Sequence, residues 1–92
     1  MVLTKNVFKP EQGGTVDISM KAPDAGHVTV KVYNLAGDQV RKPFEADVTA
    51  GLWFQAKWDG KNETGEMCGS GVYFVSVKGA GIKSIKKVIV LK

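Results

Sequence analysis

The sequence predicts an all-β fold of about seven short strands, arranged as a sandwich or a barrel. Two observations carry this prediction. Apolar and polar residues alternate with a period of two along most of the chain, as they do in strands with one face in a core and one in solvent. Clusters of turn residues interrupt the alternation, at the spacing of about 8–12 residues that small β domains show. No long segment has the helical period of 3.6.

The first half of the chain is expected to contain four strands. Residues 23–26 and residues 34–38, which include Gly37, have the composition of turns. Pro43 lies near the end of the fourth strand. Because proline has no N–H to donate to a neighbouring strand, this strand is expected at a sheet edge. The four strands are residues 6–8, 15–21, 28–33 and 39–44.

The second half is expected to contain three strands, and a long loop at 59–71 follows the first of them. In that first strand Trp58 shares one face with Leu52, Phe54 and Ala56, and Trp53 lies on the other face. The three strands are residues 52–58, 72–78 and 82–91. The residues expected to form the core are Val16, Ile18, Val28, Val30, Val32, Trp58, Tyr73, Val75, Val77, Val88 and Val90.

Length and charge narrow the class of protein. Ninety-two residues predict one domain, residues 1–92, with a single core and little room for a deep pocket. The net charge is +4, and much of the excess lies in the last ten residues. No aromatic residue suited to base stacking lies among those lysines, so nucleic acid is not an expected partner.

Cysteine content and hydropathy indicate little about the compartment. The single cysteine, Cys68, cannot form an internal disulfide. No apolar run approaches the roughly 18 residues of a membrane-spanning helix, so the chain is not expected to span a membrane. Any signal peptide is expected upstream of Met1.

A more specific pattern lies between residues 50 and 74. In one-letter code it reads AG…WDGxNxxG…SGVYF, and residues 6–10, 26–37 and 86–92 carry further similarity to the same family. The chain resembles the immunoglobulin-like domain of the flagellar hook-capping protein. It is also similar to the type A C-terminal sorting domains of the type IX secretion pathway. The residues that define the motif are Trp58, Asp59, Gly60, Asn62, Gly65, Gly71 and Tyr73.

The resemblance implies an immunoglobulin-like antiparallel β-sandwich without a catalytic site or a cofactor. It implies a non-catalytic accessory module at the C-terminal end of a secreted or cell-surface bacterial protein. Such a module acts in export, in surface sorting or in contact with other proteins. Its expected partners are the other domains of the parent chain, the export machinery or cell-surface components. A fragment of a flagellar hook-assembly protein is an alternative.

The motif also has a structural explanation that requires no chemistry. Trp58 supplies a large aromatic side chain for a thin core, and Asp59 accepts backbone N–H groups of the next turn. Gly60 and Gly65 permit positive φ values. Tyr73 is expected to bury its ring and to reach a backbone partner with its hydroxyl group.

Two details concern the ends of the motif. Gly71 lets the chain re-enter the sheet after the loop. The spacing from Gly51 to Trp58 is one residue longer than the family pattern, which predicts a β-bulge in that strand.

Catalytic chemistry is not expected. His27, the only histidine, begins a strand next to a turn and is expected to be solvated, without a nucleophile beside it. Cys68 is expected in a loop near Glu63 and Glu66, whose charges raise a thiol pKa. The carboxylates are expected singly on loops, so the sequence contains no acid–base pair.

A calcium site is a weak alternative for the loop that follows Trp58. Residues 59–63 carry oxygen donors. However, the alternating acidic pattern of a calcium loop is absent, and Lys61 occupies a position that requires a ligand. A hydrogen-bonded turn is the favoured interpretation.

Aromatic and basic residues provide a candidate contact surface. Exposed aromatic residues on a sheet can stack on a polysaccharide, or they can cover neighbouring strands or meet an adjacent domain. A carbohydrate-binding accessory module of an extracellular enzyme is therefore an alternative function. The two adjacent lysines before the final apolar segment resemble the end of a sorting domain, and charge also protects an edge strand against aggregation. The contact residues are Tyr33, Trp53, Phe74, Lys86 and Lys87.

Overall fold

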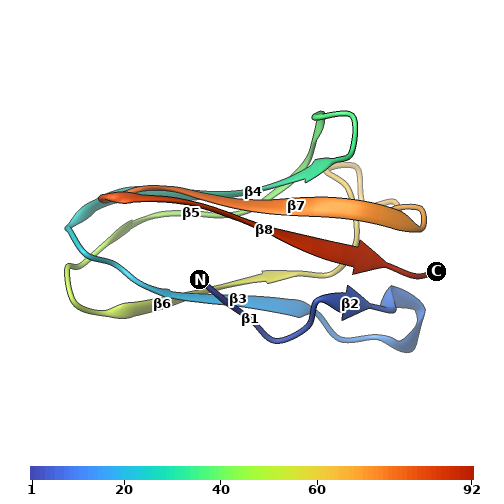
Figure 1. The fold of residues 1–92 in the computed structure, drawn as a ribbon, viewed down its shortest axis with the longest axis horizontal. Coiled ribbons are helices and arrows are strands. Elements are labelled where there is room, and N and C mark those ends of the chain that lie inside the picture. The colour runs from blue at the N-terminus through green and yellow to red at the C-terminus, as the bar shows by residue number, and fades with distance from the viewer.

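Two β-sheets face each other across one hydrophobic core (Figure 1). The computed structural model describes all 92 residues. The three-stranded sheet has the order β1-β3-β6, and the five-stranded sheet has the order β2-β8-β7-β4-β5. The strands are β1 (Val2–Leu3), β2 (Val7–Phe8), β3 (Val16–Lys21), β4 (Gly26–Asn34), β5 (Gln39–Val48), β6 (Trp53–Trp58), β7 (Gly71–Gly79) and β8 (Ile82–Val90).

The inward faces of the two sheets carry the residues that the alternation selects. All eleven expected core residues are buried, with at most 9% of their surface exposed. Phe8, Ala56, Cys68 and Ile82 join the same cluster. The all-β sandwich predicted from periodicity is therefore confirmed. No helix in the structure has the length and hydrophobicity needed to cross a bilayer.

The N-terminal segment contributes one short strand to each sheet. β1 pairs with β3 in the three-stranded sheet, and β2 then runs parallel to β8 in the five-stranded sheet. The N–H groups of Ile89 and Leu91 donate to the carbonyls of Asn6 and Phe8 at 2.8 and 2.9 Å. The expected strand at residues 6–8 is confirmed. β1 was not predicted, because two residues are too few to show alternation. The β2–β8 pair is the parallel exception in an otherwise antiparallel sandwich.

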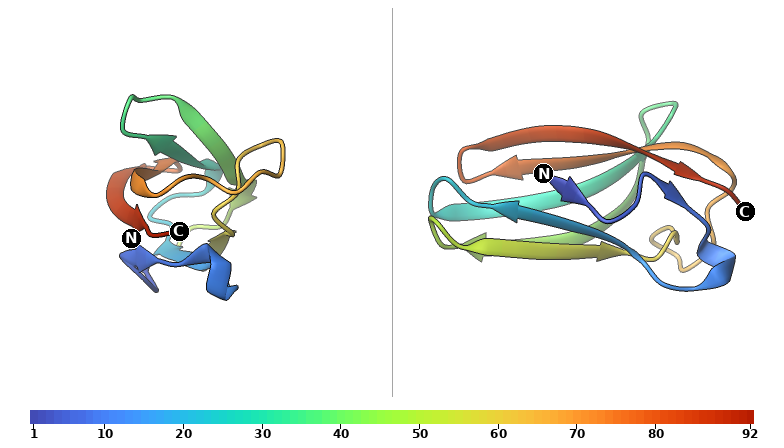
Figure 2. Two further views of the ribbon diagram at one scale, coloured as in Figure 1. Left: turned by 90° about the vertical axis from the view of Figure 1, so that its right-hand side faces the viewer. Right: turned by 60° about the horizontal axis from the view of Figure 1, so that its bottom comes forward.

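Strand β5 lies at an edge of the five-stranded sheet, as Pro43 predicts (Figure 2). It extends to Val48, beyond the expected end at residue 44. Its pairing with β4 changes register twice around Val32. Each shift inserts an extra residue into β5, so Pro43 sits in the irregular stretch where its missing N–H breaks no regular ladder.

Strand β6 is regular, and the β-bulge predicted from the spacing of Gly51 and Trp58 is wrong. β3 and β6 pair residue for residue, from Val16 opposite Trp58 to Lys21 opposite Trp53. In the turn before β6 the N–H of Gly51 donates to the carbonyl of Ala22 at 2.8 Å. The alternation in β6 is therefore unbroken, and Trp53 lies on the outer face with 63% of its surface exposed.

Trp58, at the C-terminal end of β6, packs between the two sheets. Its ring lies 5.5 Å from that of Tyr73 on β7 and 6.4 Å from that of Phe8 on β2, in tilted geometries that favour edge-to-face attraction. Only 1% of its surface is exposed. The largest side chain of the core therefore belongs to the three-stranded sheet and packs against the five-stranded sheet.

Substitution of Trp58 tests this arrangement. We expect Trp58→Ala to lower the free energy of unfolding by about 3–5 kcal/mol, because it removes a fully buried aromatic ring and leaves a cavity. The exposed Trp53→Ala is the matched control and should change stability by about 0.5 kcal/mol or less. Denaturant unfolding of both variants provides the measurement, and equal losses would show that the core assignment is wrong.

Candidate functional site

The motif turn begins where β6 leaves the sheet. The indole N–H of Trp58 donates to the carbonyl of Lys61 at 3.0 Å, and the carboxylate of Asp59 accepts the N–H of Lys61, also at 3.0 Å. Gly60 has φ +82°, and a Cβ at that position would lie 2.9 Å from Cβ of Pro10. The expected acceptor role of Asp59 is confirmed. Gly60 is needed both for its backbone conformation and for the close approach of the N-terminal segment.

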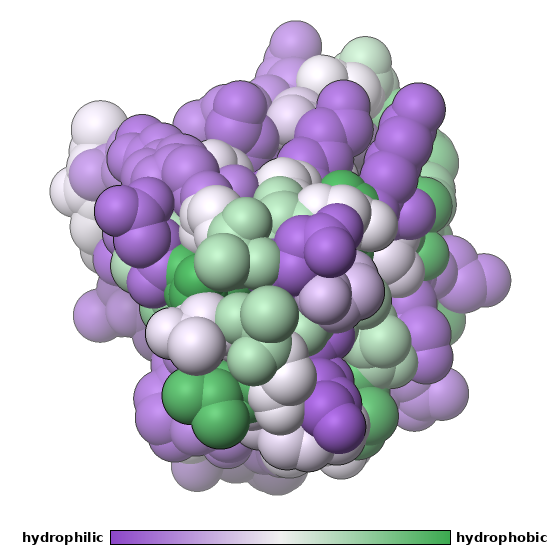
Figure 3. Space-filling view, turned by 90° about the vertical axis from the view of Figure 1, so that its left-hand side faces the viewer, coloured by the Kyte–Doolittle hydropathy of each residue, from purple (hydrophilic) through white to green (hydrophobic).

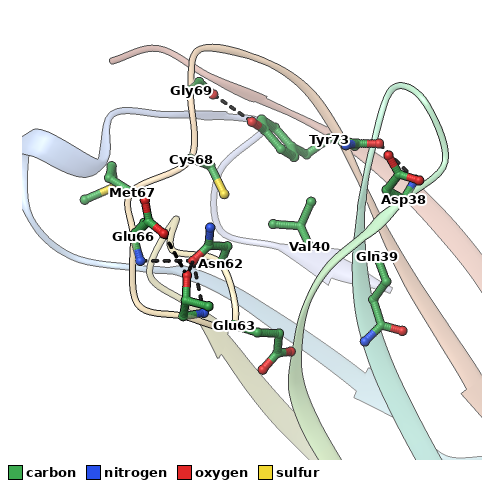
Figure 4. Close-up of a pocket in the computed structure, with 12 residues that line it drawn as sticks. Asp38, Gln39, Val40, Asn62, Glu63, Glu66, Met67, Cys68, Gly69 and Tyr73 are labelled. Atoms are coloured by element: carbon green, nitrogen blue, oxygen red, sulfur yellow. Dashed lines mark hydrogen bonds between the residues drawn. The ribbon is translucent and has the colours of Figure 1, made fainter.

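Asn62 organises the rest of the turn (Figure 4). Its side-chain oxygen accepts hydrogen bonds from the Thr64 N–H at 3.1 Å, the Thr64 hydroxyl at 2.8 Å and the Glu66 N–H at 3.0 Å. Its backbone N–H donates to the carbonyl of Glu66 at 2.8 Å, and its carbonyl accepts the N–H of Gly65 at 3.0 Å. One side chain thus satisfies two backbone donors in a segment that has no regular ladder. The sequence places Asn62 in the motif but does not show that it is the main acceptor.

The same loop covers the open edge of β5. The N–H of Glu63 donates to the carbonyl of Val40 at 3.1 Å, and the carboxylate of Glu63 accepts the N–H of Lys42. The guanidinium of Arg41 donates to the carbonyl of Asn62 at 3.1 Å and lies 3.7 Å from Asp59. Because the loop links β6 to β7, these contacts tie an edge strand of one sheet to the crossover between sheets.

A pocket of about 480 Å³ lies between this loop and the β4–β5 hairpin. Cys68 and Tyr73 line it (Figure 4), and the hydroxyl of Tyr73 donates to the carbonyl of Gly69 at 2.8 Å, as expected. Burial raises the pKa of the Cys68 thiol, and the charge of Asp59 adds to this effect. The expected direction is confirmed, but burial, with Asp59, replaces Glu63 and Glu66 as the cause. A buried, protonated thiol is a poor nucleophile.

The oxygen atoms considered for calcium are engaged by the protein itself. Asp59 and Asn62 accept N–H and O–H groups of the turn. No group of three acidic, histidine or cysteine side chains is arranged to hold a metal ion. The residues therefore do not match the donor set of a calcium loop.

His27 forms a cluster that the sequence did not predict. Its ring nitrogens lie 3.0 Å from carboxylate oxygens of Glu45 and Asp47. The cluster also includes Lys42, whose ammonium lies 3.1 Å from Glu45. His27 is exposed, as expected. The expectation of single carboxylates on loops is wrong for Glu45 and Asp47, because β5 is longer than expected and its register places both acids beside β4.

The hydrogen bonds in this cluster shift two pKa values. Those from Glu45 and then Asp47 raise the pKa of His27 above 6.5. Those from His27 and then Lys42 lower the pKa of Glu45 from 4.5 to about 2. All of these groups are exposed, so solvent screens their effect on stability.

The five candidate contact residues divide among different faces. Tyr33 on β4 lies opposite Phe74 on β7, which in turn lies opposite Lys87 on β8, so these three form a row on the outer face of the five-stranded sheet. Trp53 lies on the outer face of the other sheet. Lys86 alternates with Lys87 and lies on the opposite side of β8. The structure therefore brings together three of the five residues.

One end of the molecule is formed by three turns. The β3–β4, β5–β6 and β7–β8 turns meet there, at the left of Figure 1. In Figure 3 the middle of this end is weakly apolar and is broken up by hydrophilic residues. The exposed residues of these turns include Ala25, Ala50 and Leu52. Leu52 was expected on the face of Trp58, but β6 begins only at Trp53, so Leu52 lies in the turn and is exposed. This end is a fragmented surface with no continuous apolar stripe.

The sandwich and its hydrogen-bonded turn define an immunoglobulin-like β domain whose signature residues have architectural roles. The family follows from comparison with known proteins. The model of the FlgD Ig-like domain family matches residues 4–81, and the chain belongs to that family. The comparison with curated proteins found no match.

Solved structures with the same fold come from two bacteria. The chain is similar to PorZ, an essential surface component of the type IX secretion system of Porphyromonas gingivalis, with a TM-score of 0.66 and 21% identity over 99% of this chain and 11% of that one. It is similar to dimeric latent PorU of the same organism, with a TM-score of 0.69 and 21% identity over 98% and 9%. It is also similar to FlgD of P. aeruginosa, with a TM-score of 0.61 and 23% identity over 80% of this chain and 60% of that one. The chain thus spans about a tenth of PorZ and PorU and about three fifths of FlgD.

Replacement of Asn62 tests the organisation of the turn. We expect Asn62→Ala to destabilise the domain by about 1–2 kcal/mol, because two backbone N–H groups lose their acceptor. Asn62→Asp keeps an oxygen at that position and should recover most of the loss. Thermal unfolding of the three proteins measures this, and equal stability of all three would contradict the role of Asn62.

The His27 cluster predicts a pH window. His27 stabilises the fold below its unfolded pKa of 6.5, and its contribution is lost as pH rises through the raised folded value. Glu45 contributes above its unfolded pKa of 4.5, and this contribution is lost as pH falls towards about 2. The cluster should therefore stabilise most between pH 4.5 and 6.5.

NMR titration of the imidazole provides a direct measurement, since His27 is the only histidine. We expect its pKa to lie above 6.5 and to fall towards that value in Glu45→Gln. A midpoint at or below the ordinary value in the unmodified chain would show that the cluster does not form in solution.

Proposed function

We propose that residues 1–92 form a single non-catalytic module at the C-terminal end of a larger secreted or cell-surface bacterial protein, and that the module is recognised during export or surface attachment. The observation that carries the proposal is that the family motif serves the architecture. Trp58, Asp59, Asn62 and Tyr73 hold the sandwich and its crossover loop together. None of them leaves a reactive group free.

The similar structures support this proposal at the level of the fold. Two of them belong to much longer proteins described as a type IX secretion component and as PorU. Since the chain covers about a tenth of each, the corresponding fold is one part of a multidomain protein. A module of this kind acts through its surface, by contact with other domains of the parent chain or with the export machinery.

The polysaccharide alternative has weaker geometric support. Trp53 is the one large aromatic side chain with most of its surface exposed. Tyr33 and Phe74 are partly buried and belong to the opposite sheet. The three rings therefore do not form one stacking platform, and we favour recognition by protein.

The proposal is tested by fusion of the module to a reporter that carries a periplasmic signal peptide. In a host with a type IX system, we expect the reporter to reach the cell surface only when the 92 residues are attached at its C-terminal end. The same fusion in a strain without the outer-membrane translocon should stay in the periplasm. A fusion with Asn62→Ala, which perturbs the motif turn, should be exported less efficiently.

A reporter that remains periplasmic in the competent host, although the fused module is folded and intact, would overturn the export role. Surface exposure in both strains would show that another route carries the reporter.

A further inference from the structure

The outer face of the five-stranded sheet carries an apolar groove that no part of the chain covers. The groove has a volume of about 450 Å³ and is lined by Tyr33, Ser76, Lys78, Lys83, Ser84 and Ile85. Ile85 has 61% of its surface exposed and lies in the part of β8 that pairs with β7 but not with the short β2. Phe74 adjoins this region through its pairing with Tyr33. An exposed isoleucine on the same sheet face as two aromatic residues is an apolar surface available for contact.

The charge around this groove has one sign. Lys78 lies directly opposite Lys83, and Lys87 lies opposite Phe74. The third side is bordered by Lys31, which pairs with Ser76. None of these four lysines has a carboxylate within ion-pairing distance. Long hydrophilic side chains project from this side of the molecule at the top of Figure 3.

The chain itself supplies no acidic residue to neutralise these lysines. From residue 67 to the end there is no Asp or Glu, and the stretch contains five lysines. The carboxylates nearest on the same sheet, Glu45 and Asp47, are bound to His27 and, for Glu45, to Lys42. Like charges directly opposite each other in a sheet are destabilising, so the Lys78–Lys83 pair lowers the stability of the isolated module.

From this combination we propose that the outer face of β4, β7 and β8 docks a protein surface that presents apolar side chains flanked by carboxylates. Apolar side chains of the partner enter the groove beside Ile85 and Tyr33. Its carboxylates neutralise Lys78, Lys83 and Lys87. The inference rests on the proposed contact function and specifies the face and the chemistry of the partner.

A protein fits this face better than a lipid surface or a polysaccharide does. The groove is concave, so a side chain can reach its floor, whereas a flat headgroup layer would contact only the lysines at its rim. Tyr33 is the one aromatic residue in its lining, which offers a sugar little stacking area. Apolar contact together with charge complementarity is the usual basis of a specific protein interface.

The test uses the purified 92-residue chain with three probes. The first is a helical peptide that has a leucine stripe flanked by glutamates. The second is the same peptide with every glutamate replaced by lysine, and the third is vesicles of phosphatidylglycerol. Backbone amide shifts of the isotope-labelled chain report where each probe binds.

We expect the acidic peptide alone to shift amides of β4, β7 and β8, with an affinity that falls as salt rises. Lys83→Glu and Ile85→Ser should each weaken binding by about tenfold or more. The matched control is Lys21→Glu, the same charge change on the outer face of the other sheet, and it should have little effect. Lys83→Glu is expected to fold, since it replaces a repulsive pair with an attractive one.

Several results would overturn the proposal. These are the absence of shifts on this face, equal binding of the lysine peptide, equal weakening by Lys21→Glu, or a preference for vesicles. The measurement does not depend on export. A chain that binds the acidic peptide but fails to export a reporter refutes only the proposed function, and the reverse result refutes only the docking face.

Discussion

The packing of one indole ring constrains most of this fold. Trp58 ends a strand of the three-stranded sheet, contacts aromatic rings from two strands of the five-stranded sheet, and donates its N–H to the loop that leaves the sheet. Hence the same side chain sets the separation of the layers and the start of the crossover. A thin sandwich of 92 residues has few other large side chains that are fully buried, so smaller residues could not replace these contacts.

The crossover loop has a second role that follows from its position. Strand β5 is an exposed edge with irregular pairing, and such edges invite association with other chains. Glu63 satisfies the backbone of β5 with both its N–H and its carboxylate, and Asn62 keeps the loop in the conformation that brings Glu63 there. The motif residue Asn62 therefore helps to protect this edge, because it holds in place the loop residue that contacts β5.

The sequence was sufficient where the physics is local. Every residue that the alternation placed in the core is buried. This is because a period of two determines which side of a strand faces inward, whatever the partner strand is. The sequence was insufficient where the pairing register of the strands determines which side chains meet. The meeting of His27 with Glu45 and Asp47, and the separation of Trp53 from Tyr33 and Phe74, depend on which strands are neighbours and on two shifts in the β4–β5 pairing. The central role of Asn62 depends on loop conformation, which Asn and Asp can both support.

Charge is distributed in a way that stability alone does not explain. The acidic residues of β5 are matched by His27 and Lys42, so local pairing is available to this sheet. The lysines of β7 and β8 nevertheless have no such partners and include a like-charged cross-strand pair beside an exposed isoleucine. Surface charge of one sign contributes to solubility, but solubility does not require an apolar groove between the charges. Repulsion and apolar exposure are both relieved when a complementary surface covers them, and this makes the outer face of the five-stranded sheet the part of the module best suited to contact.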